Sequence, residues 1–228
     1  MKNYSVFVIN ISDKRWEKYS QDKNNIYNRF LGVDGSTLDL EEYKKYVFYW
    51  NKSEKGRRGA IGCSESHMNM MKYIYENQLN HVIVIEDDAI IDFSRLHELD
   101  DIKGFCFIGG RLQATKLKDD NVFQSQIKKT LELKKLNKID TDKYIVTGAH
   151  GLYFDTWETA KDIFDDIHKQ TRRRISDVEL KRIQKTRPHI INQFIYPAIS
   201  TLHLPDAMEG FTYNKDTSYN LKDNNYEY

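Results

Sequence analysis

Apolar and polar positions alternate along the chain in a way that predicts strands separated by helices. Short apolar runs rich in β-branched and aromatic residues predict buried strands at 6–11, 82–85, 105–110, 144–146 and 151–154. Helical patterns occupy the stretches around 16–23, 65–77 and from residue 176 onward. Strands that alternate with helices are typical of an α/β domain. We therefore predict a single α/β domain with a mostly parallel central sheet flanked by helices.

The predicted helix at 65–77 leads directly into the strand at 82–85. Its periodicity places His67, Met71 and Ile74 on one apolar face, and Ser64 is a suitable N-cap. A histidine on such a face is usually a packed core residue. His67 is a candidate for ligand contact only because the helix leads toward a cluster of acidic residues.

The strand at 82–85 ends abruptly in Glu86, Asp87 and Asp88. Open parallel sheets bind ligands at the carboxyl ends of their strands. Adjacent carboxylates repel one another unless a cation lies between them, and oxygen ligands suit Mg²⁺ or Mn²⁺. Side chains of an extended chain alternate, so Glu86 and Asp88 would share one side and are the predicted metal ligands. The alternative is that the acids only solvate the following loop.

Composition excludes several classes of function. The chain has 228 residues with 35 basic and 34 acidic side chains, and the net charge of +1 supplies no basic field for nucleic acid. Cys63 and Cys106 form no CxxC motif, which predicts free thiols and a cytoplasmic location. No stretch approaches the roughly 18 apolar residues of a membrane span. Any membrane contact is expected to be peripheral.

A glycine-spaced basic segment at 56–62 precedes the helix at 65–77. Gly59 and Gly62, with Arg57 and Arg58 beside them, predict a loop that approaches a diphosphate, because helix N-termini and arginines both favour anions. The spacing matches neither the Walker nor the Rossmann pattern. Glycine loops before helices are also common without a ligand.

Three features of the last third of the chain have both structural and functional explanations. Ser176 and Glu179 form the pattern of a capping box, and the helix dipole favours Asp177 in the first turn. His203 lies in an irregular stretch from which a late ligand can return to a metal. The arginines at 172–174 predict a solvated basic face, or a site for an acceptor phosphate or an anionic lipid head group.

Taken together, three motifs resemble those of the family 25 glycosyltransferases. They are V-F-V-I-N at 6–10 followed by Arg15, G-x-x-G-C-x-x-S-H at 59–67, and E-D-D at 86–88, and the resemblance spans roughly residues 4–205. This family includes bacterial lipooligosaccharide galactosyltransferases and collagen galactosyltransferase domains. The resemblance implies a GT-A fold, a nucleotide-sugar donor that is usually UDP-linked, and inversion at the anomeric carbon.

The resemblance also implies roles for individual residues. Glu86 and Asp88 take the family's acidic metal-binding and ribose-binding positions, and Asp177 matches the aspartate of a later D-x-x-L segment and is the candidate base. His203 is the candidate third metal ligand. Donor-binding positions are expected at Asn10, Arg15, Asp34, Gly59, Gly62, Ser66, His67 and Asp87.

The resulting hypothesis is a metal-dependent, inverting glycosyltransferase in residues 1–212, with a polar tail at 213–228. It would move galactose or glucose from a UDP-sugar to a glycan, glycolipid, lipooligosaccharide or hydroxylysine-type acceptor with Mn²⁺ or Mg²⁺. Two alternatives stay open. One is a metal-dependent nucleotidyl- or phosphotransferase, because acids at a strand end serve phosphoryl transfer equally well. The other is a non-catalytic carbohydrate-binding protein on a decayed transferase fold, against which the intact acids argue.

Overall fold

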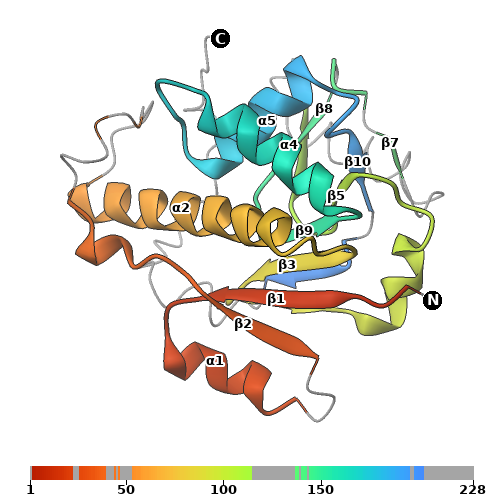
Figure 1. Ribbon diagram of the computed structural model, residues 1–228, viewed down its shortest axis with the longest axis horizontal. Coiled ribbons are helices and arrows are strands. Elements are labelled where there is room, and N and C mark those ends of the chain that lie inside the picture. Colours follow the sequence, from red (N-terminus) through yellow and green to blue (C-terminus); the bar gives the residue numbers. More distant parts are fainter. Residues whose placement is uncertain are drawn as a thin grey trace.

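A mixed sheet forms the centre of the molecule. The computed structural model describes residues 2–22, 26–39, 44, 46, 53–114, 137–138, 140–142, 144–195 and 198–202. Within these residues seven strands pair in the order β2-β1-β3-β9-β5-β10-β7 (Figure 1). Their bounds are Ser5–Asn10 for β1, Tyr27–Leu31 for β2, Val82–Glu86 for β3, Phe105–Phe107 for β5, Asn137–Lys138 for β7, Gly151–Phe154 for β9 and Gln193–Phe194 for β10.

Most of these strands run in one direction. β1 pairs in parallel with β2 and with β3, and β10 pairs in parallel with β5. β9 lies antiparallel between β3 and β5, and β7 is antiparallel to β10. Of the seven strands in the described part of the sheet, five therefore share one direction. This confirms the α/β class and the largely parallel sheet, and the arrangement is consistent with a GT-A-like fold.

Two shorter pairings extend the carboxyl edge of the sheet. β4 (Ala89–Ile91) comes after β3 and a two-residue turn, and it pairs antiparallel with β11 (Ser200–Leu202). β6 (Arg111–Ala114) pairs antiparallel with β8 (Tyr144–Thr147). Between β8 and β9 the chain bends, and Gly148 there has a φ of +86°, which glycine adopts without strain.

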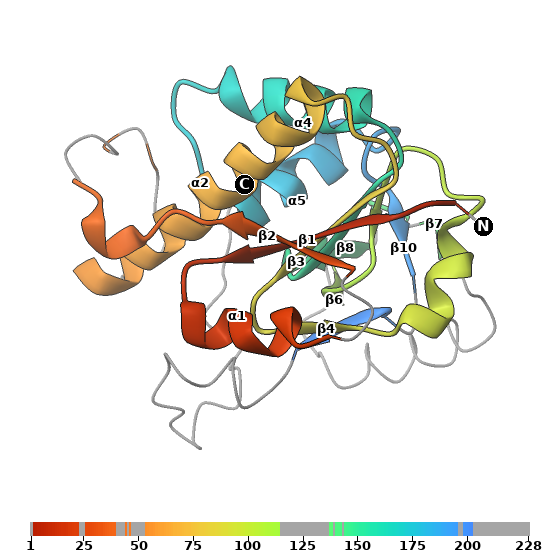
Figure 2. The same ribbon diagram turned by 60° about the horizontal axis from the view of Figure 1, so that its bottom comes forward.

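Helices cover both faces of the sheet. α2 (Glu54–Glu76), α4 (Trp157–His168) and α5 (Ser176–Thr186) lie on one face, while α1 (Asp13–Ser20) and the 3-10 helix η2 (Phe93–Leu99) lie on the other (Figures 1 and 2). A second 3-10 helix, η1 (Gly35–Thr37), contacts α2. The sheet is thus the middle of three layers.

β3 separates two hydrophobic cores. Val82 and Val84 pack with Met71 and the other apolar residues under α2, α4 and α5, whereas Ile83 and Ile85 pack in the cluster under α1 and η2. All four strand residues are at most 1% exposed, which confirms a strand buried on both faces. The predicted apolar face of α2 is confirmed as well, because His67, Met71 and Ile74 are buried.

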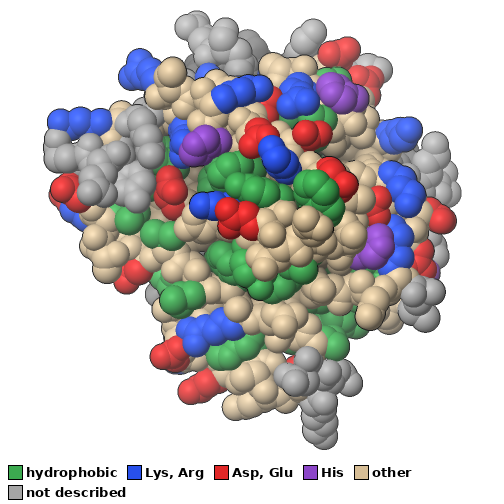
Figure 3. All heavy atoms as spheres, viewed as in Figure 1, with side chains coloured by type: hydrophobic (Ala, Val, Ile, Leu, Met, Phe, Trp, Pro, Cys, Tyr) green, Lys and Arg blue, Asp and Glu red, His purple; other side chains and the backbone are tan. Residues whose placement is uncertain are grey.

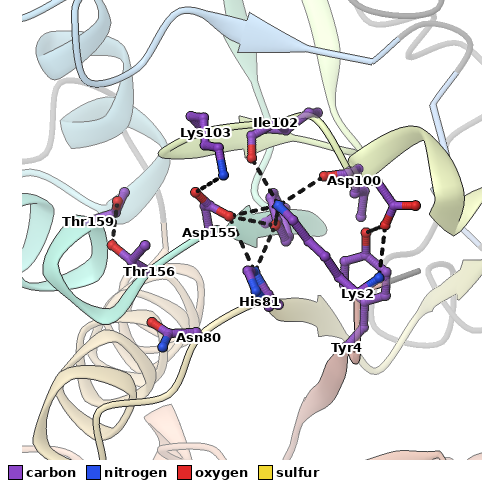
Figure 4. Close-up of polar contacts among 12 residues, drawn as sticks. Lys2, Tyr4, Asn80, His81, Asp100, Ile102, Lys103, Asp155, Thr156 and Thr159 are labelled. Atoms are coloured by element: carbon purple, nitrogen blue, oxygen red, sulfur yellow. Dashed lines mark hydrogen bonds and ion pairs between the residues drawn. The ribbon is translucent and has the colours of Figure 1, made fainter.

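A polar cluster closes the amino-terminal end of the sheet (Figure 4). Lys2 Nζ lies 2.9 Å from Asp155 Oδ1, and His81 Nδ1 lies 3.3 Å from the same oxygen. Tyr4 donates a hydrogen bond of 2.8 Å to Asp100 Oδ1. These contacts fasten the segments that enter β1 and β3, so both strands reach the opposite edge in fixed register.

The predicted basic loop at 56–62 is wrong, because these residues belong to α2. Ser53, and not Ser64, caps the helix by accepting a hydrogen bond of 3.2 Å from the Gly56 amide. A Cβ atom at Gly62 would lie 2.8 Å from both Val33 O and Gly35 N. Glycine at 62 therefore permits close contact between the helix and the η1 segment, which a sequence pattern cannot reveal.

The predicted capping box at Ser176 and Glu179 is also wrong. Ile175 occupies the N-cap position, so Ser176 is already the first residue of α5. Glu179 Oε1 instead accepts a hydrogen bond of 2.9 Å from the Arg174 amide, and Glu179 Oε2 lies 2.6 Å from Arg182 Nε. Glu179 thus still supports the start of α5, because its carboxylate binds the backbone amide of Arg174, which precedes the helix.

Basic and acidic residues are nearly equal in number in this chain, and both kinds occur on its surface. On the face shown in Figure 3, basic and acidic side chains are interspersed. Among the described helices, none combines the length and the apolar character that crossing a bilayer requires. The predicted boundary at 212–213 lies outside the described residues and stays a prediction.

The contrast between two glycines of α2 predicts opposite stability effects. Gly59→Ala should stabilise the protein by about 0.5–1 kcal/mol, because its Cβ meets nothing within 4 Å and alanine favours the helix. Gly62→Ala should destabilise it by about 1–3 kcal/mol, because the backbone at 33–35 has to move. Urea unfolding measures both variants. Equal stability of the Gly62→Ala variant and the wild type would contradict the close contact.

Candidate active site

The acidic turn at the carboxyl end of β3 is held by one carboxylate. Asn10 Nδ2, at the end of β1, donates a hydrogen bond of 2.8 Å to Asp87 Oδ2. Arg15 Nη1, from α1, lies 2.9 Å from Asp87 Oδ1. Asp87 is 8% exposed, and both of its oxygens have partners. Asp87 therefore joins three elements of the site, and its oxygens are already engaged.

α1 fixes the same turn at a second point. The Tyr19 hydroxyl donates a hydrogen bond to the carbonyl oxygen of Ala89, the first residue of β4. Ser12 caps α1 by accepting from the Arg15 amide, which is why this helix starts at Asp13, earlier than predicted. Arg15 and Tyr19 lie one turn apart on α1, so a single helix positions both sides of the turn.

Asp88 differs from Asp87 because one of its carboxylate oxygens has no described partner. Its Oδ1 atom is buried and has no hydrogen-bond partner among the described residues. Burial, together with repulsion from Glu86 and Asp87, raises the pKa of Asp88 from 3.8 to about 6. Asn10 Oδ1 is a second buried acceptor without a donor in the same part of the structure. Two unsatisfied oxygens at an acidic turn suit a hard divalent cation.

Glu86 is directed toward α2. Its Oε1 atom accepts a hydrogen bond of 3.0 Å from His67 Nε2 and one of 3.5 Å from Cys63 Sγ. Burial acts to raise the pKa of Glu86, but the hydrogen bond and charge of His67, together with the charge of His150, outweigh it and lower the pKa. Glu86 is thus an ionised carboxylate with hydrogen-bond partners on α2, whereas the Asp88 Oδ1 atom has no described partner.

Side chains alternate along an extended strand, and this alternation is the reason to expect Glu86 and Asp88 on the same side. It holds only as far as the end of β3. The strand stops at Glu86, and Asp87 and Asp88 form a turn, so extended geometry does not apply beyond it. Glu86 and Asp88 are nevertheless close enough for the charge of one to raise the pKa of the other. Contacts with neighbouring elements decide that Glu86 has side-chain hydrogen-bond partners while Asp88 Oδ1 has no described partner.

Cys63 lies where α2 faces the first turn of α5. Desolvation is the largest cause that raises the pKa of its thiol, ahead of the negative charges of Glu86 and Asp177. Ser176 contributes a hydrogen bond to the thiol. The first turn of α5 therefore brings Asp177, the predicted base, near Cys63 and Glu86.

A further set of predicted donor-binding residues shapes the contact between α2 and the η1 segment. They are Asp34, Gly59, Gly62 and Ser66. Asp34 caps η1 by accepting a hydrogen bond of 2.8 Å from the Ser36 amide. Ser66 Oγ accepts one of 2.8 Å from the Val33 amide and donates one of 2.7 Å to Gly62 O. These contacts explain the residues structurally, and their contact with a donor stays a prediction.

The last predicted ligand, His203, lies outside the described residues. The chain before it does reach the site, because Leu202 pairs with Ala89, the residue directly after Asp88. The Ser200 amide also donates a hydrogen bond of 2.8 Å to Ile108 O. β11 thus returns the chain to the acidic turn from the far end of the sequence.

Sequence reasoning missed two residues of the site. Cys63 lies four positions before His67 on α2, a spacing that becomes visible only if the helix is extended through the glycines. His150 lies at the turn before β9, where its Nε2 accepts a hydrogen bond of 2.9 Å from the Gly110 amide and its charge acts on Glu86. No pattern in the sequence indicates that this turn approaches β3.

Comparison with known families agrees with the geometry. A family model described as glycosyltransferase family 25 (LPS biosynthesis protein) matches residues 3–159. The matched segment includes Asn10, His67 and the acids at 86–88, and it ends before Asp177. A comparison with curated proteins finds no match.

The raised pKa of Asp88 predicts a pH-dependent stability. The folded-state pKa of about 6 exceeds the ordinary 3.8, so the wild type loses stability as pH rises through this window. With a chelator present, Asp88→Asn should melt at a higher temperature than the wild type at about pH 8, and this gain should shrink toward about pH 4. The exposed Asp101→Asn variant is the control. Equal melting temperatures at the higher pH would contradict the assignment.

Proposed function

Because the chain belongs to glycosyltransferase family 25, we propose that it transfers galactose or glucose from a UDP-sugar to an acceptor hydroxyl by a single inverting displacement. The observation that carries the proposal is the buried Asp88 Oδ1 atom, which has no described partner, beside a paired Asp87 at the carboxyl edge of β3. Such an edge is where open α/β sheets bind nucleotides. The negative charge of the acidic turn supports a cation and a diphosphate as its complement.

The residues at the acidic turn fit a divalent ion such as Mn²⁺ or Mg²⁺. Asp88 would hold it, with Glu86 as the neighbouring oxygen ligand, and His203 is the proposed third ligand because β11 ends beside the turn. When bound, such an ion neutralises the diphosphate and improves it as a leaving group. Asp87 would act differently, by holding Asn10 and Arg15 in place around the donor.

The acceptor hydroxyl would lose its proton to the Asp177 carboxylate. A general base has to lie within reach of the attacking oxygen, on the side of the sugar opposite to the leaving group. The charge of Asp177 acts on Cys63, which also contacts Glu86, so the start of α5 lies near the acid that ends β3. Asp177 accepts the proton while the acceptor oxygen attacks the anomeric carbon.

The donor site is proposed to extend from the acidic turn along the segment after β2. The Gly32 amide donates a hydrogen bond of 3.0 Å to Asn10 O, which connects the segment carrying Asp34 with the end of β1. The orphaned Asn10 Oδ1 atom can accept a hydrogen bond from a donor hydroxyl or amide. Gly59, Gly62 and Ser66 would support this segment from α2.

The acceptor is proposed to be a glycan of the lipopolysaccharide or lipooligosaccharide type. A hydroxylysine-type acceptor is the alternative. The description of the matching family names LPS biosynthesis. Arg172 is exposed near the start of α5 and can contact an anionic head group, whereas the Arg173 side chain is 11% exposed and lies 4.0 Å from Glu65. A cytoplasmic, membrane-peripheral location is part of this proposal.

Asp88→Asn tests the metal assignment. We expect UDP release from a panel of UDP-sugars with Mn²⁺ to fall at least about 100-fold in kcat/KM, because a metal ion supplies several kcal/mol of charge stabilisation. Asp101→Asn should retain wild-type turnover. A folded Asp88→Asn variant with unchanged turnover would overturn the assignment, and release of sugar 1-phosphate in place of UDP would indicate nucleotidyl transfer.

Asp177→Asn separates donor binding from transfer. The variant should show the same thermal shift with UDP-sugar and Mn²⁺ as the wild type, while transfer to acceptor falls by about 10²–10⁴-fold, the contribution of a general base. Asp162→Asn, at an exposed position of α4, is the matched control. Unchanged transfer would exclude Asp177 as the base.

A further inference from the structure

Three side chains of different chemistry, from α2 and from the end of β3, lie close together. Cys63 and His67 lie four residues apart on α2 and therefore on the same side of that helix, and Glu86 comes from the end of β3. One potential ligand atom from each of the three lies within 4.8 Å of the other two. Such a set differs from the oxygen atoms around Asp88.

The spacing of these atoms is close to that of a tetrahedral metal site. Zinc bonds of about 2.3 Å to sulfur and about 2.0–2.2 Å to nitrogen and oxygen place neighbouring ligand atoms about 3.3–3.7 Å apart. The distance from His67 Nε2 to Glu86 Oε1 is 3.0 Å, and that from Cys63 Sγ to Glu86 Oε1 is 3.5 Å. Cys63 Sγ lies within 4.8 Å of a ring nitrogen of His67, so side-chain adjustment of this pair would accommodate an ion.

Charge and accessibility favour a borderline-soft ion. A thiolate and a carboxylate together neutralise a dication, and a neutral imidazole adds a third ligand. Sulfur and nitrogen ligands select Zn²⁺ or Co²⁺ over Mg²⁺ and Mn²⁺. Cys63 is exposed, so an ion has a path from solvent and a water molecule can fill the fourth position.

We propose that Cys63, His67 and Glu86 form a binding site for Zn²⁺, separate from the oxygen-ligated cation at Asp88. Glu86 belongs to both sets, because its Oε1 atom contacts His67 and Cys63 while its charge acts on Asp88. Zinc would hold this carboxylate against α2. The two ions therefore compete for Glu86, and zinc inhibits any reaction that needs the Asp88 site.

Metal binding at this site would release a proton from the thiol. Only the thiolate is a metal ligand, so a zinc or cobalt ion displaces the proton of Cys63. Binding should accordingly tighten as pH rises.

Cobalt titration of the chelator-stripped, full-length protein tests the site without any sugar nucleotide, so its outcome is independent of the proposed transfer reaction. The wild type should develop a thiolate-to-cobalt charge-transfer band and the visible bands of tetrahedral Co²⁺, and both should disappear when Zn²⁺ is added. Cys63→Ser should abolish the charge-transfer band, and His67→Gln should weaken binding more than about 100-fold, since it removes a direct ligand.

Two variants serve as controls for this titration. Cys106→Ala removes the other thiol, which is buried in the opposite core, and should leave the band unchanged. Asp88→Asn should also retain it, because Asp88 is not a ligand. Absence of the band in the wild type, or its persistence in a folded Cys63→Ser variant, would overturn the proposal. Loss of the band in Asp88→Asn would show that the ion binds at the acidic turn instead.

Discussion

The Asp87 carboxylate is the contact on which the site depends. It accepts from Asn10 at the end of β1 and from Arg15 on α1, so it joins two elements to the turn after β3. Its neighbour Asp88 differs, because the Asp88 Oδ1 atom is buried without a described partner. One acid thus holds the turn together while the other keeps an unsatisfied oxygen, although the two are adjacent in sequence and chemically identical.

The two ends of the sheet differ in how completely their polar groups are satisfied. At the amino-terminal end, Lys2, His81 and Asp155 form a closed cluster of ion pairs. At the carboxyl end, Asn10 and Asp88 each keep a buried acceptor without a donor among the described residues. Burying such groups costs free energy, and the two cores on either side of β3 offset that cost. A ligand that supplies positive charge would remove the cost.

Glu86 interacts with two groups of potential metal ligands of different chemistry, the oxygens of the acidic turn and the thiol and imidazole on α2. Its backbone ends the central strand, its carboxylate accepts from His67 and Cys63 on α2, and its charge raises the pKa of Asp88. An oxygen-preferring cation would draw it toward the turn, whereas a sulfur-preferring cation would hold it at the helix. The segment that the family model matches includes the acidic turn as well as Cys63 and His67, and the continuous helix α2 brings the thiol and the imidazole to the same carboxylate.

Local patterns determined the α/β class, the doubly buried strand, the acidic turn and the buried face that carries His67, because each depends on the order of residues within one element. The tertiary structure decided the rest. It made β9 antiparallel, placed Gly59 and Gly62 inside a helix, and paired Asp87 while leaving Asp88 Oδ1 without a described partner. Each of these outcomes depends on contacts between segments far apart in the chain, and the periodicity of one segment carries no information about which other segment will approach it.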